Sequence, residues 1–333
     1  MSSRHKKPFL TIEEQINLLE SRGLIFHDKE NARKTLLSEN YYSVINGYKR
    51  PFLDPDKTNA DIDVYKPGTC FELIELVYLF DKALRRITLP RLLDAENSMR
   101  TAVIYAFCEK HREDYAYLDP ANYCSPKEYG GSKKNYSRNL ITLLSKLLAI
   151  SSNTREESIK HYEKKYGVIP LWVASKFITF GVMSNFYELQ SLDIKQKACM
   201  YMTQITSVNI SPRQLVNTYK ILSKYRNICA HEERMYCSRV GRNKENSCRD
   251  MITALSFVIN KNEMSEYANA LKSLIESMRR NSIYTAIMDE ILNDMKIDDS
   301  FLETFIIDKS EDSLSISNSD TNTDAKNGTA EKD

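Results

Sequence analysis

The sequence predicts an all-α protein, and three observations favour that class. The 333-residue chain contains only nine glycines and nine prolines, whereas these residues together average roughly 12% of a protein. This scarcity of turn residues excludes a β-sandwich, a propeller or a glycine-looped Rossmann protein. Apolar residues recur at helical spacing in most segments, and capping motifs precede several of them.

Residues 1–68 are expected to form a helical extension followed by a linker. The segment 11–14, Thr-Ile-Glu-Glu, has the pattern of a capping box and predicts a first helix directly after it. A second helix is expected over 28–37 and a third over 39–48. Residues 51–68 are rich in proline, aspartate and glycine, a composition that indicates a linker.

Residues 69–308 are expected to form the main helical domain. Thr69 and Glu72 have the spacing of a second capping box, ahead of a long helix over 71–111. Pro90 is expected to kink or split that helix near Thr88. After a loop over 112–138, further helices are predicted at 139–151, 155–165 and 171–190.

The clearest helix start in the chain is Ser211-Pro-Arg-Gln214. A serine N-cap, a proline at the first helical position and a closing glutamine occur together there. This helix is expected to run to about Met235, with two or three more helices over 248–306.

Residues 309–333 are predicted to be a disordered acidic tail. The segment is rich in Ser, Asn, Asp and Thr, and it carries six acidic residues against three lysines. Such a composition cannot bury enough apolar surface to fold. Because the whole chain has a formal charge of +2, the rest of the chain is mildly basic, which is compatible with a nucleic-acid groove.

The cysteines indicate neither a disulfide scaffold nor a metal centre. Their number is seven, their spacing is wide and no C-x-x-C occurs, which argues against a zinc knuckle. No metal and no cofactor are therefore expected. The chain also lacks an apolar run of 18 residues, so no membrane span is predicted and a cytoplasmic location is expected.

One face of the helix predicted after Ser211 should be core. Leu222, Tyr225 and Cys229 fall on one side of it at about 100° per residue. Cys229 is accordingly expected to be an inert core residue.

A second face of the same helix has the residues for phosphodiester chemistry. Asn227, His231 and Arg234 are spaced i, i+4 and i+7, and Arg226 can swing its long side chain toward them. An imidazole can move a proton to or from a ribose 2′-OH. A guanidinium can hold a phosphate through two hydrogen bonds, and an amide can orient either group. A histidine near a helix end also often serves only as a capping group.

The remaining charged candidates each allow two interpretations, one as an RNA contact and one as a purely structural residue. Lys133, Lys134 and Arg138 accompany several tyrosines and can bind RNA, although tyrosines also simply pack loops. Arg239 can extend the phosphate contacts of Arg234, or lie in a solvated turn.

Glu96 and Arg100 are spaced i, i+4 and predict an intrahelical ion pair. Their alternative role is to support the helix that carries His231.

Arg226-Asn-Ile-Cys-Ala-His231 resembles the R-N-x-x-x-H form of the HEPN ribonuclease motif. The wider chain, over about residues 7–240, resembles the bacterial abortive-infection D/F family. The blocks that carry this resemblance are Lys7–Thr11 with Ser21–Leu24, Asn40–Tyr42 with Gly47-Tyr48, Gly68–Phe71 with Tyr78, Phe80-Asp81 and Leu84–Arg86, Glu96 with Arg100, and Trp172 with Phe180–Ser184.

The resemblance implies a HEPN-like helical bundle that acts as a metal-independent RNA endonuclease. Such enzymes attack through the 2′-OH and leave a 2′,3′-cyclic phosphate. The family implies a toxin that defends against phage, works as a homodimer and is in some cases restrained by a small structured antitoxin RNA. By this analogy, Arg226 binds the phosphate, Asn227 positions a reacting group, His231 orients it or transfers a proton, and Arg234 binds the neighbouring phosphate.

Two alternatives remain open at this stage. One is a HEPN-like scaffold that binds a structured small RNA without cutting it, because Glu232 and Glu233 follow the histidine and would repel RNA. The other is a helical interaction protein that senses a phage component.

Overall fold

The protein is all-α, as the sequence predicts. The computed structural model describes residues 8–307 except 60–61, 154 and 281, so the predicted disordered tail at 309–333 lies outside the described residues. Within the described part the only β-type pairings are isolated bridges such as Leu53 with Tyr65. The α-helices of the first half of the chain are α1 (Ile12–Ser21), α2 (Lys29–Glu39), α3 (Phe71–Lys110), α4 (Pro126–Tyr129), α5 (Lys133–Ser151) and α6 (Glu157–Tyr166).

The second half of the described chain is also helical. Its α-helices are α7 (Leu171–Ala174), α8 (Phe180–Glu188), α9 (Leu192–Thr206), α10 (Pro212–Ala230), α11 (Cys248–Ser256), α12 (Lys261–Arg279), α13 (Ser282–Met295) and α14 (Asp299–Glu303). Short irregular helices connect these elements, namely the π-helix η1 (Tyr42–Asn46) and the 3-10 helices η2 (Arg50–Phe52), η3 (Ala116–Leu118), η4 (Pro120–Asn122) and η5 (Ser175–Phe177).

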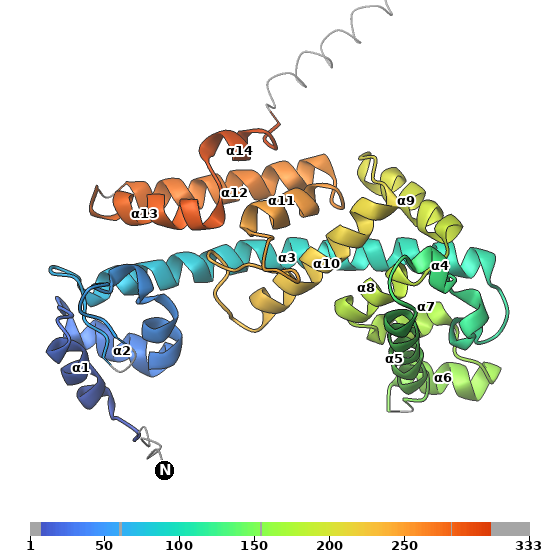
Figure 1. Ribbon diagram of the computed structural model, residues 1–333, viewed down its shortest axis with the longest axis horizontal. Coiled ribbons are helices and arrows are strands. Elements are labelled where there is room, and N and C mark those ends of the chain that lie inside the picture. Colours follow the sequence, from blue (N-terminus) through green and yellow to red (C-terminus); the bar gives the residue numbers. More distant parts are fainter. Residues whose placement is uncertain (1–7, 60–61, 154, 281, 308–333) are drawn as a thin grey trace, which may run out of the picture.

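A single 40-residue helix, α3, forms the central axis of the fold. It crosses the whole molecule in Figure 1, with α1 and α2 at one end, α5 to α8 at the other and α11 to α13 along one side. It packs against α9, α10 and α12. Of the kink or split expected near Thr88, the split does not occur: α3 continues through Pro90 as one helix.

Of the two capping boxes predicted for the first half of the chain, one is present and the other is not. The box at Thr11 is present, with the Thr11 side chain accepting from the N–H of Glu14. The box at Thr69 is wrong: α3 starts at Phe71 and no side chain caps it. Glu72 instead accepts hydrogen bonds from the backbone N–H groups of His27 and Asp28, each at 3.0 Å, and so ties the start of α2 to α3.

The N-terminal segments are packed onto the first half of α3. Val44 and Ile45 of η1 are fully buried, and Phe52 and Tyr65 of the stretch predicted as a linker are only 5% and 4% exposed. Lys66 N donates to Phe52 O at 2.9 Å, which closes this stretch into a loop. The carbonyl of Gly47 accepts from Arg234, so the extension lies beside the residues that follow α10.

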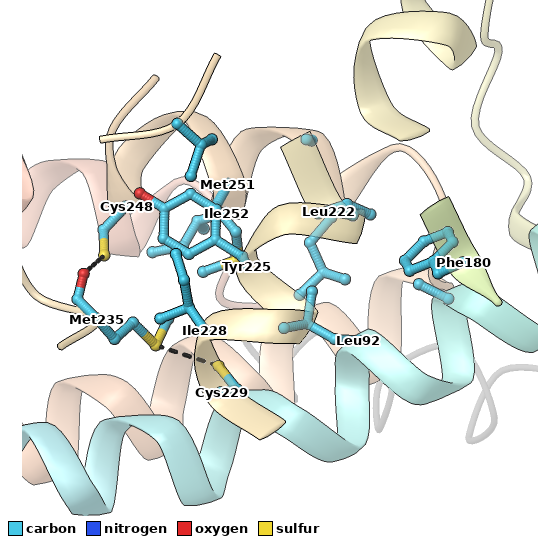
Figure 2. Packing of buried hydrophobic residues seen from close by; sticks show 14 of the residues in the cluster. Leu92, Phe180, Leu222, Tyr225, Ile228, Cys229, Met235, Cys248, Met251 and Ile252 are labelled. Carbon is cyan, nitrogen blue, oxygen red and sulfur yellow. Dashed lines mark hydrogen bonds between the residues drawn. The ribbon is translucent and has the colours of Figure 1, made fainter. Parts of the chain in front are cut away.

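The core face predicted for α10 is correct. Leu222 and Tyr225 are fully buried and Cys229 is 5% exposed. Figure 2 shows this face among side chains of α3 and α11. Cys248 Sγ lies 3.2 Å from the carbonyl oxygen of Met235, so the residues after α10 are held against α11.

Candidate functional site

The start of α10 is as predicted, but its end is not. Ser211 and Gln214 form the capping box, and Pro212 is the first helical residue. The helix ends at Ala230 rather than near Met235, because Glu232 has a left-handed φ of 56°. The N–H of Glu233 then donates to the carbonyl of Ile228 at 2.9 Å, the 6→1 bond of a Schellman motif. Arg234 is therefore not on the helical row expected for it.

Arg226 is bound by a buried carboxylate of α3. Its Nε lies 2.9 Å from Oε2 of Glu96, whose side chain is 9% exposed. The other oxygen of Glu96 accepts from Arg100 at 2.6 Å. Glu96 thus makes both contacts considered from the sequence, one within α3 and one to α10. The single negative charge of Glu96 is thus shared between Arg100 and Arg226. Arg226 does not line the nearby cleft.

Asn227 connects Arg226 to the end of the helix. Nη1 of Arg226 donates to Oδ1 of Asn227 at 2.9 Å. The backbone N–H of His231 donates to the carbonyl of Asn227 at 2.9 Å. Both Asn227 and His231 are exposed, so the imidazole is open to a ligand while the helix end that carries it is fixed.

The turn after His231 is anchored by a second buried carboxylate of α3. Oδ1 of Asp81 accepts from the N–H groups of Met235 at 3.1 Å and Tyr236 at 2.8 Å. Oδ2 accepts from the hydroxyl of Tyr48 and from Arg85, both at 2.6 Å. Asp81 is completely buried, and its charge is balanced by Arg85. Such saturation of a buried carboxylate fixes its surroundings in one geometry.

His231 lines a cleft of about 790 Å³ between the N-terminal extension and the turn after α10. We call it the His231 cleft. The residues lining it are Tyr42, Ser43, Gly47, Tyr48, Arg50, Tyr78, His231, Glu232, Glu233, Arg234, Cys237, Ser238, Arg239, Lys244 and Asp294.

Arg234 and Arg239 of the His231 cleft are held by backbone carbonyl groups rather than by carboxylates. Arg234 Nη1 donates to the carbonyl of Gly47 at 2.9 Å. Arg239 donates to the carbonyls of Ser238 at 3.1 Å and Asp294 at 2.5 Å. These bonds fix the guanidinium groups without neutralising them, which suits them to an anionic ligand.

The other predicted RNA-binding cations lie elsewhere. Lys133, Lys134 and Arg138 are exposed residues on α5, and they are not among the residues that line the His231 cleft. In the adjoining loop, Tyr117 and Tyr123 are buried, and their hydroxyls donate to backbone carbonyl groups. These two tyrosines pack the loop and present no face to a base.

Sequence reasoning did not single out Asp81, Arg85, Tyr42 or Arg50 as site residues. Asp81 and Arg85 had a detectable signal, because an acid and an arginine spaced i, i+4 within an apolar helix indicate a buried pair. No local sequence pattern placed Tyr42 or Arg50 beside His231, since their position there depends on how the extension folds.

Cysteine chemistry is disfavoured at this site. Burial raises the pKa of the Cys229 thiol to about 12 and also raises that of Cys237, so both are poor nucleophiles at neutral pH. Among the described residues, His27, Cys70 and Glu72 could hold a metal ion, with ligand atoms within 4.8 Å of one another. None of these three lines the His231 cleft.

Residues 34–237 match the family described as Abi-like protein. The match covers more than half of the chain, which therefore belongs to this family. No curated protein and no solved structure matches the chain at a significant level. Within its described part, no helix combines the length and apolar character needed to cross a membrane.

Proposed function

We propose that the protein is a metal-independent RNA endonuclease that acts in abortive infection, with the His231 cleft as its active site. Membership of the Abi-like family supports the defence role. One observation carries the chemical proposal: His231 shares its cleft with Arg234 and Arg239, whose guanidinium groups are fixed by carbonyl oxygens.

The reaction we propose uses the 2′-OH of the RNA as its nucleophile. His231 takes the proton from the 2′-OH, whose oxygen attacks the adjacent phosphorus. The bond from phosphorus to the 5′ oxygen breaks, that oxygen takes up a proton, and a 2′,3′-cyclic phosphate remains. Arg234 and Arg239 stabilise the charge on the phosphate.

Arg226 has a positioning role in this proposal. It is bound by Glu96, its Nη1 donates to Asn227, and it does not line the cleft, so it acts by holding Asn227 and the end of α10 in place. Asn227, which is exposed, can then orient the ribose or the phosphate through its amide nitrogen.

We also propose that the enzyme acts in the cytoplasm as a homodimer and is restrained by a small structured RNA. The support is the resemblance of the Arg226–His231 segment to HEPN motifs, which act in facing pairs. A second copy of the cleft would supply the group that protonates the leaving oxygen.

The experiment compares wild type, His231→Ala and His161→Ala on total cellular RNA in EDTA, followed by analysis of the fragment ends. His161 is an exposed histidine of α6 outside the cleft and is the matched control. We expect cyclic-phosphate ends from wild type and His161→Ala, and no cleavage by His231→Ala. Equal cleavage by all three would contradict the assignment of His231.

A second candidate is a scaffold that holds RNA without cutting it. Glu232 and Glu233 line the same cleft, and their charges oppose the approach of a phosphate. This alternative predicts that a specific RNA is retained by both wild type and His231→Ala and that neither protein produces fragments.

A further inference from the structure

We propose that Tyr42 is a stacking platform for an unpaired base of the RNA bound in the His231 cleft, so that this cleft selects single-stranded RNA. The inference rests on the function proposed above and names the form of its substrate. It assigns the N-terminal extension a direct part in binding.

Tyr42 is an exposed aromatic residue at a charged cleft. Its side chain is 73% exposed, and in the described part of the chain no other aromatic ring packs against it. Because the ring is exposed and lines a cleft that also contains cations, one of its faces is available to stack with a base. Two other tyrosines line the cleft, but Tyr48 bonds Asp81 and Tyr78 bonds Glu39.

The backbone that presents Tyr42 is irregular in two ways. Asn40 has φ 70° and ψ 134°, a conformation that non-glycine residues rarely adopt, and its side chain accepts from the N–H of Tyr42 at 2.9 Å. Tyr42 then begins the π-helix η1. Strained residues and π-helical turns are both concentrated at functional sites.

The platform is rigid even though its ring is exposed. Val44 and Ile45 of the same turn are fully buried. The carbonyl of Gly47 accepts from Arg234, and the hydroxyl of Tyr48 donates to Asp81. Buried Asp81 is therefore bonded both to Tyr48 on one wall of the cleft and to the N–H groups of Met235 and Tyr236 on the other. These bonds hold the turn that carries Tyr42 in a fixed relation to the turn after His231.

The charges around Tyr42 suit a nucleic acid strand. Four cations line the same cleft and outnumber its three acids; the cations are Arg50, Arg234, Arg239 and Lys244, and the acids are Glu232, Glu233 and Asp294. Cations beside an exposed ring are the combination that binds single strands. A base paired within a duplex has both faces covered by its neighbours, so it cannot stack on a side chain. The ring therefore favours an unpaired nucleotide.

The test uses the fact that the chain has a single tryptophan, Trp172, which does not line the His231 cleft. In a Trp172→Phe background, the separate substitutions Tyr42→Trp and Tyr166→Trp give two variants, each with a single tryptophan whose fluorescence is measured. Tyr166 is also an exposed tyrosine, 55% exposed on α6, and is the matched control. The probe is a labelled 12-nucleotide 2′-O-methyl RNA, which has no free 2′-OH to react, supplied either single-stranded or paired with its complement.

We expect the single strand to bind, as seen in its fluorescence anisotropy, and to quench the tryptophan at position 42 but not the one at position 166. The duplex should quench much less. Binding of the strand without quenching at position 42 would overturn the stacking inference and leave the proposed nuclease intact. No binding of either probe by any variant would overturn both.

A second comparison needs no tryptophan. Tyr42→Ala should weaken single-strand binding about tenfold, the usual order for loss of one base–aromatic stack, whereas Tyr42→Phe should keep it because the ring remains. Tyr166→Ala should bind as wild type does. Equal affinities for Tyr42→Ala and Tyr42→Phe would contradict the proposal, and unfolding of either variant would be recognised by circular dichroism.

Discussion

Arg226 of α10 and Glu96 of α3 form a largely buried ion pair with 2.9 Å between Nε and Oε2. The pair connects two helices whose contact residues are 130 positions apart in sequence. It fixes the end of α10, and Asp81 of the same helix α3 fixes the following turn.

In an Arg100→Met background, which removes the second cation bound to Glu96, a double-mutant cycle on Arg226→Met and Glu96→Gln should give a coupling free energy of unfolding of about 2 kcal/mol or more, since removing one partner then leaves a largely buried charge. The matched control is Lys220→Met with Glu188→Gln, an ion pair at 2.6 Å that also involves α10 but in which the Lys220 side chain is 51% exposed. That pair should couple by under about 1 kcal/mol. Urea unfolding of the variants measures both coupling free energies. Equal values for the two ion pairs would contradict the prediction for Arg226 and Glu96.

Asp81→Asn should lower the free energy of unfolding by about 2–4 kcal/mol, because Arg85 loses its counter-charge and the amide cannot accept all four hydrogen bonds. The amides of Met235 and Tyr236 should exchange hydrogen faster than in wild type. Asp94→Asn, at an exposed position of the same helix, should change neither quantity. Unchanged exchange at Met235 in Asp81→Asn would show that Asp81 does not anchor the turn.

Glu232→Gly should raise the free energy of unfolding by about 0.5–1 kcal/mol, because glycine adopts the left-handed φ of this position without strain. Glu233→Gly removes the same charge from the cleft but has no positive φ to relieve. It should therefore be neutral or destabilising. Thermal unfolding of the two variants decides the matter, and a destabilised Glu232→Gly would show that the glutamate side chain has a stabilising role.

The contact between α2 and α3 should weaken in acid. Hydrogen bonds from Lys82 and Tyr78 lower the pKa of Glu39 below 4.5. Because the carboxylate is favoured in the folded state, its contribution is present above pH 4.5 and is lost as the pH falls through the lowered pKa. Lys82→Met should make the loss of stability between pH 5 and 3 shallower. An unchanged slope, measured by urea unfolding at each pH, would exclude this contact as a source of acid sensitivity.

The sequence predicts the elements of the fold better than it predicts the cleft. The start of α10 is correct because the motif from Ser211 to Gln214 is local and unambiguous. The end is wrong because Glu232 occupies a left-handed position where glycine is the usual signal. The continuity of α3 through Pro90 is likewise set by packing on both sides of the helix rather than by local propensity.

The predicted site is divided between two places in the structure. His231, Arg234 and Arg239 lie in one cleft, whereas Arg226 is paired with Glu96 and the cations of α5 lie elsewhere. Helical spacing predicts which residues of α10 share a face. It could not bring in Tyr42 or Arg50, since these reach the cleft through the fold of a separate segment.

Because helix α3 is uninterrupted, it sets both the distance and the relative direction of the two carboxylates that anchor the site. Asp81 and Glu96 are 15 residues apart on it, which places them about 22 Å apart along the axis and within about 60° in direction. Inserting one residue between Arg85 and Glu96 would turn one carboxylate by about 100° relative to the other, so that only one end of the turn around His231 could be held. Seven inserted residues would nearly restore the direction but separate the two anchors by a further 10 Å or so. The chain length between these two acids is therefore as much a part of the site as the acids themselves.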